Sequence, residues 1–229
     1  MEKKGAGSIE FILAFVLFAG FSAAALYFFN PSGGTKNLDY SRDYTMRELI
    51  ENVSVKLEIY SVILTGNEPR ISMRFSGINP LANVYATDYY GNKMPAWRNG
   101  EYVCIERDNN EDFSTIYFSE DLPYAGDSPN CPQSEKYKIA SSLSNKVISE
   151  NKILALNKSY NSDYILLKRQ LKIPEDTDFS FLLEFQDTSK IGIDKTISVT
   201  RSILSETDRV EVLKTNGNVQ FGRLTVKVW

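Results

Sequence analysis

The feature that most constrains this chain is a run of nineteen uncharged residues from Phe11 to Phe29, which reads FILAFVLFAGFSAAALYFF. As a helix, such a run extends roughly 28 Å at about 1.5 Å of rise per residue, and a hydrocarbon core is about 30 Å thick. The run is longer than the apolar part of a cleavable secretory signal, and it ends in bulky side chains rather than at a small-residue cleavage site. We therefore predict a transmembrane helix over residues 6–29, with the lipid bilayer as a partner.

The charges on the two sides of this run predict its orientation. Lys3 and Lys4 precede the run, whereas the first lysine beyond it is Lys36. Positive charge near a span is retained on the cytoplasmic side. The expected location is therefore the cell membrane, crossed once, with the N-terminus in the cytoplasm and the C-terminal domain outside.

Glu10 stands directly before the apolar run. An acidic residue at the centre of a span costs on the order of 2.5 to 3.5 kcal/mol, and less near the interface. One interpretation is that the carboxylate reaches the headgroup level. The other is that a partner neutralises it.

The residues before the run follow a particular order, because residues 3–11 read KKGAGSIEF. This segment resembles the class III signal peptide of archaeal type IV prepilins, in which a basic residue and a glycine precede cleavage and a glutamate follows. The resemblance implies that a prepilin peptidase cuts between Gly5 and Ala6 and removes residues 1–5 as a leader. It also implies that Glu10 is an assembly contact with the N-terminal amine of a neighbouring pilin or pseudopilin subunit. Ala6 departs from the family, because many members have glutamine there.

The rest of the chain divides into a linker and one domain. The sequence NPSGGT at residues 30–35 combines proline with two glycines, which ends a helix, so residues 30–40 are expected to form a linker. Residues 41–229 then form an extracellular, β-rich domain, which opens with a short helix over 42–52.

Alternation of apolar and polar residues predicts the strands of this domain. The first two, at 53–59 and 71–75, flank a turn and are expected to pair as an antiparallel hairpin. The further predicted strands are 83–89, 101–107, 113–118, 179–185, 195–203, 208–214 and 219–228.

Helical periodicity interrupts these strands. Four residues spaced by four, three and four positions would share one helical face: Tyr160, Tyr164, Leu167 and Leu171. We predict two short helices, at 145–156 and 162–171. The expected fold class is α+β, an N-terminal transmembrane helix followed by a mainly antiparallel β exterior domain with two short helices.

Cys104 and Cys131 are the only cysteines, and an even pair in an exterior domain predicts a disulfide. Closing a loop of this length is worth roughly 3.6 kcal/mol in the chain-entropy model. Two free thiols, or a redox pair, are the alternatives.

Two segments match the acceptor pattern for N-glycosylation, at Asn52 and Asn157, whereas Asn30 fails because Pro31 follows it. Asn52 and Asn157 are therefore candidate glycosylation sites. Their presence agrees with an exterior location.

The chain has no histidine, which removes the usual general base and the commonest metal ligand. No pair stands out among the 29 acidic side chains, so we predict no catalytic residue, no metal site, no cofactor and no enzymatic activity. The 26 basic residues against those 29 acidic ones leave no basic footprint for nucleic acid. Tyr89, Tyr90 and Trp97 could face a glycan or a partner, and packing in the core and turns is the alternative.

Together these features favour a non-enzymatic type IV pilin-like cell-surface subunit, of the minor-pilin or pseudopilin type, that a prepilin peptidase processes at its N-terminus. The alternative is a membrane-anchored extracellular module that binds a ligand or mediates adhesion without entering a filament.

Overall fold

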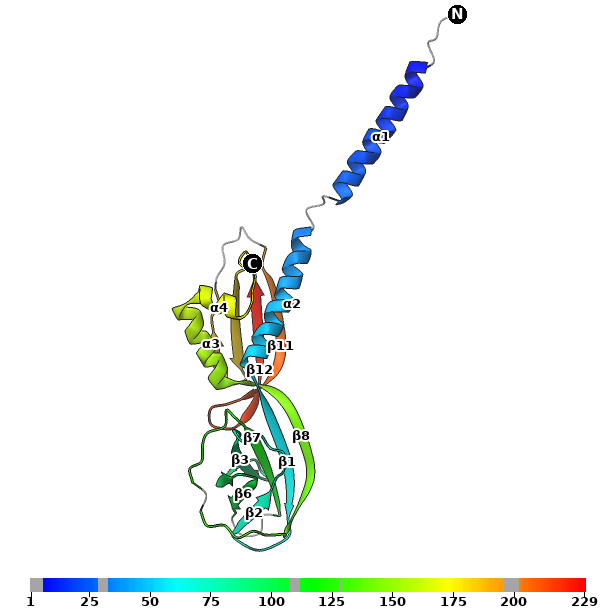
Figure 1. Cartoon of the computed structure of the whole chain (residues 1–229). Helices are drawn as coiled ribbons and strands as arrows, with labels where there is room; N and C mark the ends of the chain where they lie inside the picture. The colour runs from blue at the N-terminus through cyan, green and yellow to red at the C-terminus, as the bar shows by residue number, and fades with distance from the viewer. Residues whose placement is uncertain (1–5, 29–32, 108–111, 128, 196–201) are drawn as a thin grey trace, which may run out of the picture.

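Figure 1 shows a computed structural model with a projecting N-terminal helix and a body built mainly of strands. The described backbone covers residues 6–28, 33–107, 112–127, 129–195 and 202–229. Within these stretches the side chains of 6–10, 26–28 and 33–37 are not described.

The described residues contain four helices. They are α1 (Ala6–Phe28), α2 (Gly33–Val53), α3 (Glu150–Ser162) and α4 (Tyr164–Gln170). Helix α2 begins earlier than the helix predicted at 42–52, so residues 33–40 of the expected linker are helical. Gly33 and Gly34 were expected to end a helix. They lie instead in the first turn of α2, where glycine is tolerated. The remainder of that linker, 30–32, lies outside the described residues.

The same described stretches contain twelve strands. They are β1 (Ser54–Leu64), β2 (Arg70–Arg74), β3 (Asn83–Asp88), β4 (Lys93–Met94), β5 (Ala96–Asn99), β6 (Tyr102–Glu106), β7 (Phe113–Ser119), β8 (Tyr137–Ser149), β9 (Phe179–Phe185), β10 (Lys190–Gly192), β11 (Leu204–Leu213) and β12 (Val219–Val228). Part of the strand predicted at 195–203 lies outside the described residues.

The predicted α+β class is wrong, because the fold is mostly β, with 43% strand and 26% helix. Residues 145–149, predicted as the start of a helix, continue strand β8, where Val147 pairs with Val55 and both are buried. Here the burial gained by strand pairing outweighs local helical preference. Helix α3 starts only at Glu150, where the Ser149 hydroxyl caps it by accepting a hydrogen bond from the Lys152 N–H at 3.1 Å.

The transmembrane helix predicted over residues 6–29 is also corrected. A crossing helix needs about 20 consecutive, predominantly apolar residues. Within the described part of the chain, no helix combines the length and the apolar character required to cross a membrane.

Nine strands form one curled sheet in the order β10-β9-β12-β11-β8-β1-β7-β3-β4, and three form a small sheet in the order β2-β6-β5. The predicted hairpin between β1 and β2 is wrong. Strand β1 lies between β7 and β8, and β2 pairs with β6 in the small sheet. Both edges of β1 are thus occupied by strands that are distant in sequence.

Figure 1 shows that the body has two parts, joined where β1 and β8 pass from one to the other. We call the part with α2, α3, α4 and β9 to β12 the proximal half, because α1 leads into it. The part with β2 to β7 and most of β1 and β8 is the distal half.

Each half has its own hydrophobic core. In the proximal half, Leu49 and Val53 of α2 pack with Phe179 and Phe181 of β9. The distal core includes rings and aliphatic side chains of β2, β6 and β7 and of the residue that follows β2: Met73, Phe75, Ile105, Ile116 and Phe118.

A third cluster joins the two halves. It packs Leu57 of β1 and Val147 of β8 with Tyr85 of β3 and Leu213 of β11. The Tyr85 hydroxyl also donates to Asn218 Oδ1, at 2.8 Å, in the turn between β11 and β12. Apolar packing and a hydrogen bond therefore hold the halves together.

Candidate functional site

The first candidate site is the apolar surface of α1. Its described side chains stand largely exposed, with Phe11 at 78%, Phe18 at 69% and Phe21 at 76%. A large contiguous apolar surface that is exposed usually marks a contact with another protein or with a membrane. In Figure 1, α1 projects away from the body.

The N-terminal residues singled out by the sequence lie at the start of this helix. Gly5 is outside the described residues, and Ala6 is the first residue of α1. Glu10 lies in the second turn of α1, and the side chains of both Ala6 and Glu10 are outside the described part. On the C-terminal side of the predicted cleavage site, Ala6 is therefore helical.

Helix α2 connects α1 to the body. Its buried residues Met46, Leu49 and Val53 face the proximal core, where the helix lies against β11 and β12. Arg42 also forms an ion pair with Glu206 of β11, with 3.4 Å between Nε and Oε2. Apolar packing and an ion pair therefore anchor α2 to the main sheet.

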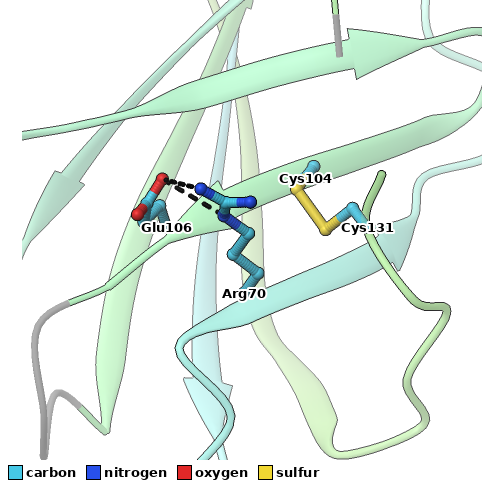
Figure 2. The surroundings of a disulfide bond; sticks show 4 residues. All are labelled: Arg70, Cys104, Glu106 and Cys131. Atoms are coloured by element: carbon cyan, nitrogen blue, oxygen red, sulfur yellow. Dashed lines mark hydrogen bonds and ion pairs between the residues drawn. A yellow bond between two sulfur atoms is a disulfide. The ribbon is translucent and has the colours of Figure 1, made fainter. Parts of the chain in front are cut away.

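The second candidate site lies in the distal half, around the disulfide between Cys104 and Cys131. Figure 2 shows the bond joining β6 to the segment after β7, with the Cα atoms 6.0 Å apart. Next to it, Arg70 and Glu106 form an ion pair across β2 and β6, with 3.1 Å between Nη2 and Oε2. The Ser134 N–H donates to the Ser72 carbonyl at 3.2 Å, which ties the same segment to β2.

This tethered segment forms one wall of a groove with a volume of about 350 Å³. Pro123 and Tyr124 of the segment line the groove together with Trp97 of β5 and Met94 of β4. The ammonium of Lys93 lies 5.7 Å from the ring centroid of Tyr85, also in the lining. Aromatic rings with a cation at the rim suit an amphipathic ligand such as a sugar ring.

Tyr124 gives the groove a polar edge. Its hydroxyl donates to Asp127 Oδ1 at 3.0 Å, and this hydrogen bond to a carboxylate raises the pKa of the Tyr124 phenol. The ring is mostly exposed, so Tyr124 presents an apolar face and a neutral hydroxyl to solvent.

The structure separates the aromatic residues that the sequence grouped. Trp97 lines the groove, but Tyr89 and Tyr90 do not. Those two pack edge to face with centroids 5.4 Å apart, and Tyr89 also contacts Phe113 at 6.1 Å. The sequence analysis did not single out Tyr124. The feature that could have indicated it is the Pro123-Tyr124 pair, which lies in the segment between the two cysteines.

A smaller cavity of about 200 Å³ lies between the halves. Lys56 and Glu58 of β1 line it together with Lys152 of α3. Lys56 contacts one oxygen of the buried Glu58 carboxylate, while the Lys152 ammonium donates to the Ser54 carbonyl at 2.9 Å. Among the described residues, the second oxygen of the Glu58 carboxylate is buried without a hydrogen-bond partner, and the Lys152 ammonium is held by a neutral carbonyl rather than by a carboxylate. Within the described residues, no group of three or more acidic or cysteine side chains could hold a metal ion.

Both candidate glycosylation sites lie in helices. Asn52 is exposed near the end of α2, whereas Asn157 is half-buried in α3 and its carbonyl oxygen accepts from Asn161 Nδ2 at 2.7 Å. Of the two, Asn52 is more accessible to a modifying enzyme.

Comparisons with protein-family models, curated protein sequences and solved structures found no match for this chain. Its function is therefore inferred from its own residues and geometry.

Proposed function

We propose that this chain is a non-enzymatic type IV pilin-like subunit of the cell surface, of the minor-pilin or pseudopilin type, which a prepilin peptidase processes between Gly5 and Ala6. The observation that carries the proposal is the exposed apolar surface of α1. A helix with that surface requires a cover, and the equivalent helices of neighbouring pilin subunits would provide one. The body would be displayed outside the cell.

Two further features support this proposal. The glutamate at position 10 lies near the start of α1, where it would meet the new N-terminal amine of a neighbour. Such a pair replaces two isolated buried charges with one neutral unit. The absence of histidine agrees with a structural rather than an enzymatic role.

Processing can be tested by N-terminal sequencing of the native protein from cells with an active prepilin peptidase. We expect the chain to begin at Ala6, and Gly5→Leu to abolish cleavage because a side chain then obstructs the peptidase. Gly20→Ala is the matched control, because an added Cβ at Gly20 would meet no atom within 4 Å. A wild-type chain that still begins at Met1 or Glu2 would refute the processing.

Assembly can be tested on the processed protein. We expect Glu10→Gln to be cleaved normally but to co-purify with filaments about a hundredfold less than wild type, because removing one partner of a buried charge pair costs about 3 kcal/mol or more. Absence of the wild-type chain from every filament fraction would argue against assembly while leaving processing intact.

A second function is favoured by the aromatic groove: an extracellular module for ligand binding or adhesion that does not enter a filament. Trp97 is the largest side chain of the groove wall, and truncating such a residue at a binding site costs about 2 kcal/mol or more, roughly thirtyfold in affinity.

The groove can be tested on an array of neutral and acidic oligosaccharides. We expect Trp97→Ala to lose the strongest signal of the wild type and Trp97→Phe to retain part of it, because a flat ring is preserved. Tyr90→Ala is the control, because Tyr90 is 85% exposed and lies outside the groove. Equal loss with Tyr90→Ala, or no wild-type signal, would exclude glycan binding by the groove.

A further inference from the structure

Strand β8 has one paired edge and one open edge. Its first edge pairs with β1 from Tyr137 to Ile148. The second edge pairs only at Ile148 and Ser149, with β11. Between residues 138 and 146, no strand from the described parts of the chain lies on that second edge, and β8 forms the outer margin of the distal half in Figure 1.

The open edge has little of the protection usual for such strands. Exposed edges are normally blunted by charges, proline, a bulge or a covering loop. Here a bulge at Ala140 shifts the register with β1, but residues 139–145 contain neither a charge nor a proline. Ser141–Lys146 remain a regular stretch of about 20 Å. Leu143, in the middle of this stretch, is 55% exposed.

Strand β11 has a second open edge. It pairs with β12 along its whole length and with β8 only at Val212 and Leu213. Residues 204–211 therefore present an unpaired edge among the described residues, and Thr207, Asp208 and Arg209 on it are exposed.

The two edges carry opposite charge. The β8 edge has Lys138 and Lys146 and no acidic residue between them. The β11 edge has three acidic side chains, at positions 206, 208 and 211, and one basic side chain, at 209. Within the chain Glu206 pairs with Arg42, Glu211 accepts a hydrogen bond from Asn145 Nδ2, and Lys146 of β8 pairs with Glu51. Among the described residues, the opposite charges left for a second copy are therefore Lys138 on β8 and Asp208 on β11. Pairing β8 with another β8 would bring lysines together, whereas pairing β8 with β11 sets basic against acidic residues.

We propose that the open edge of β8 in one copy pairs with the open edge of β11 in a second copy, so that the main sheets join from molecule to molecule. Because the two edges differ, the contact is heterologous and propagates into an open array unless rotation closes it. This contact lies beyond the proposed processing and α1 packing, and it depends on neither.

The test uses full-length chains in detergent, which covers the apolar surface of α1. One preparation carries Ser142→Cys in β8 and the other Thr207→Cys in β11, and both keep the native disulfide closed. After mixing with a short bismaleimide, we expect a crosslinked species that contains one chain of each kind. Ile165→Cys is the control for random collision, because Ile165 is exposed on α4.

Further variants test the physical basis of the contact. Leu143→Lys should lower crosslinking several-fold, whereas Ile165→Lys should not, because both side chains are exposed but only Leu143 lies on the edge. Lys138→Glu in one chain should weaken the contact, and Asp208→Lys in the other should restore it.

Three outcomes would overturn the proposal: crosslinking no greater than that of the Ile165→Cys control, Ser142→Cys chains linked mainly to each other, or equal effects of Leu143→Lys and Ile165→Lys. N-terminal sequencing of the same preparation separates the two proposals. A heterologous crosslink in chains that begin at Met1 would refute processing and leave the edge contact standing.

Discussion

Replacing Cys104 and Cys131 together with serine is expected to lower the free energy of unfolding by about 3.6 kcal/mol, the chain-entropy value for a loop of this length. The two residues are separated by 27 positions, and the bond closes the segment that walls the aromatic groove. The loss is large, because domains of this kind are stable by only about 5 to 15 kcal/mol. Urea denaturation followed by circular dichroism would measure it.

Reduction of the wild type provides the control. It should give the same loss as the double serine variant, because both remove the covalent link and leave the side chains small. We also expect the Tyr124 side of the groove to loosen, while Pro123 stays held through its neighbour Leu122, which is buried and whose carbonyl accepts from Asn83 Nδ2 at 2.8 Å. A change below about 1 kcal/mol would show that these contacts alone hold the segment.

The second large effect is a loss of stability at alkaline pH, caused by two tyrosines in the proximal core. Burial raises the pKa of Tyr160 to about 12, and burial also raises the pKa of Tyr164. The Tyr160 hydroxyl donates to the Phe179 carbonyl at 2.6 Å. The Tyr164 hydroxyl donates to Asp178 Oδ1 at 3.1 Å and accepts from the Phe179 N–H at 2.9 Å.

The direction of the stability change follows from the unfolded state, in which tyrosine ionises near pH 10. In the folded protein the pKa of Tyr160 is higher than in the unfolded chain. The contribution of Tyr160 to the free energy of unfolding is therefore fully present below pH 10 and is lost as the pH rises toward 12. At about 1.36 kcal/mol per pKa unit, Tyr160 alone should account for about 2 kcal/mol of lost stability by pH 11.5. Tyr164 adds to this loss in the same direction.

The measurement is urea denaturation at a series of pH values between 7 and 11.5, on the wild type and on Tyr160→Phe. At pH 7 the variant should be about 1 kcal/mol less stable, because the Phe179 carbonyl loses its donor. At pH 11.5 the order should reverse, since phenylalanine cannot ionise. Tyr90→Phe, at an exposed position, should follow the wild type throughout. An identical pH dependence in wild type and Tyr160→Phe would contradict the buried-tyrosine explanation.

Periodicity in the sequence predicted several elements correctly, because it reports which side chains face a core. Tyr160, Leu167 and Leu171 are buried and Tyr164 is half-buried in the proximal core. They do not share one helical face as predicted, because α3 ends at Ser162, α4 covers Tyr164–Gln170 and Leu171 follows it. The strands predicted at 83–89, 113–118, 179–185 and 219–228 correspond to β3, β7, β9 and β12. Their alternation is set within a few residues, so it is visible without knowledge of the partners.

The sequence did not show in the same way which strands pair with one another. The predicted hairpin of 53–59 with 71–75 failed because β1 pairs with β7 and β8, which lie far along the chain. The helix predicted from residue 145 failed because β8 extends to Ser149 along β1. In both places a long-range strand partner supplied burial that no local pattern records.

For the candidate sites, the sequence alone determined the apolar run, the KKGAGSIEF segment and the presence of two cysteines, because each depends only on residue identity and order. The tertiary structure alone decided that the class is mostly β, that Tyr124 rather than Tyr89 and Tyr90 joins Trp97 in a groove, and that β8 and β11 keep open edges. The physical reason is that grooves and edges are made by segments far apart in sequence, whose meeting is set by the packing of the whole sheet.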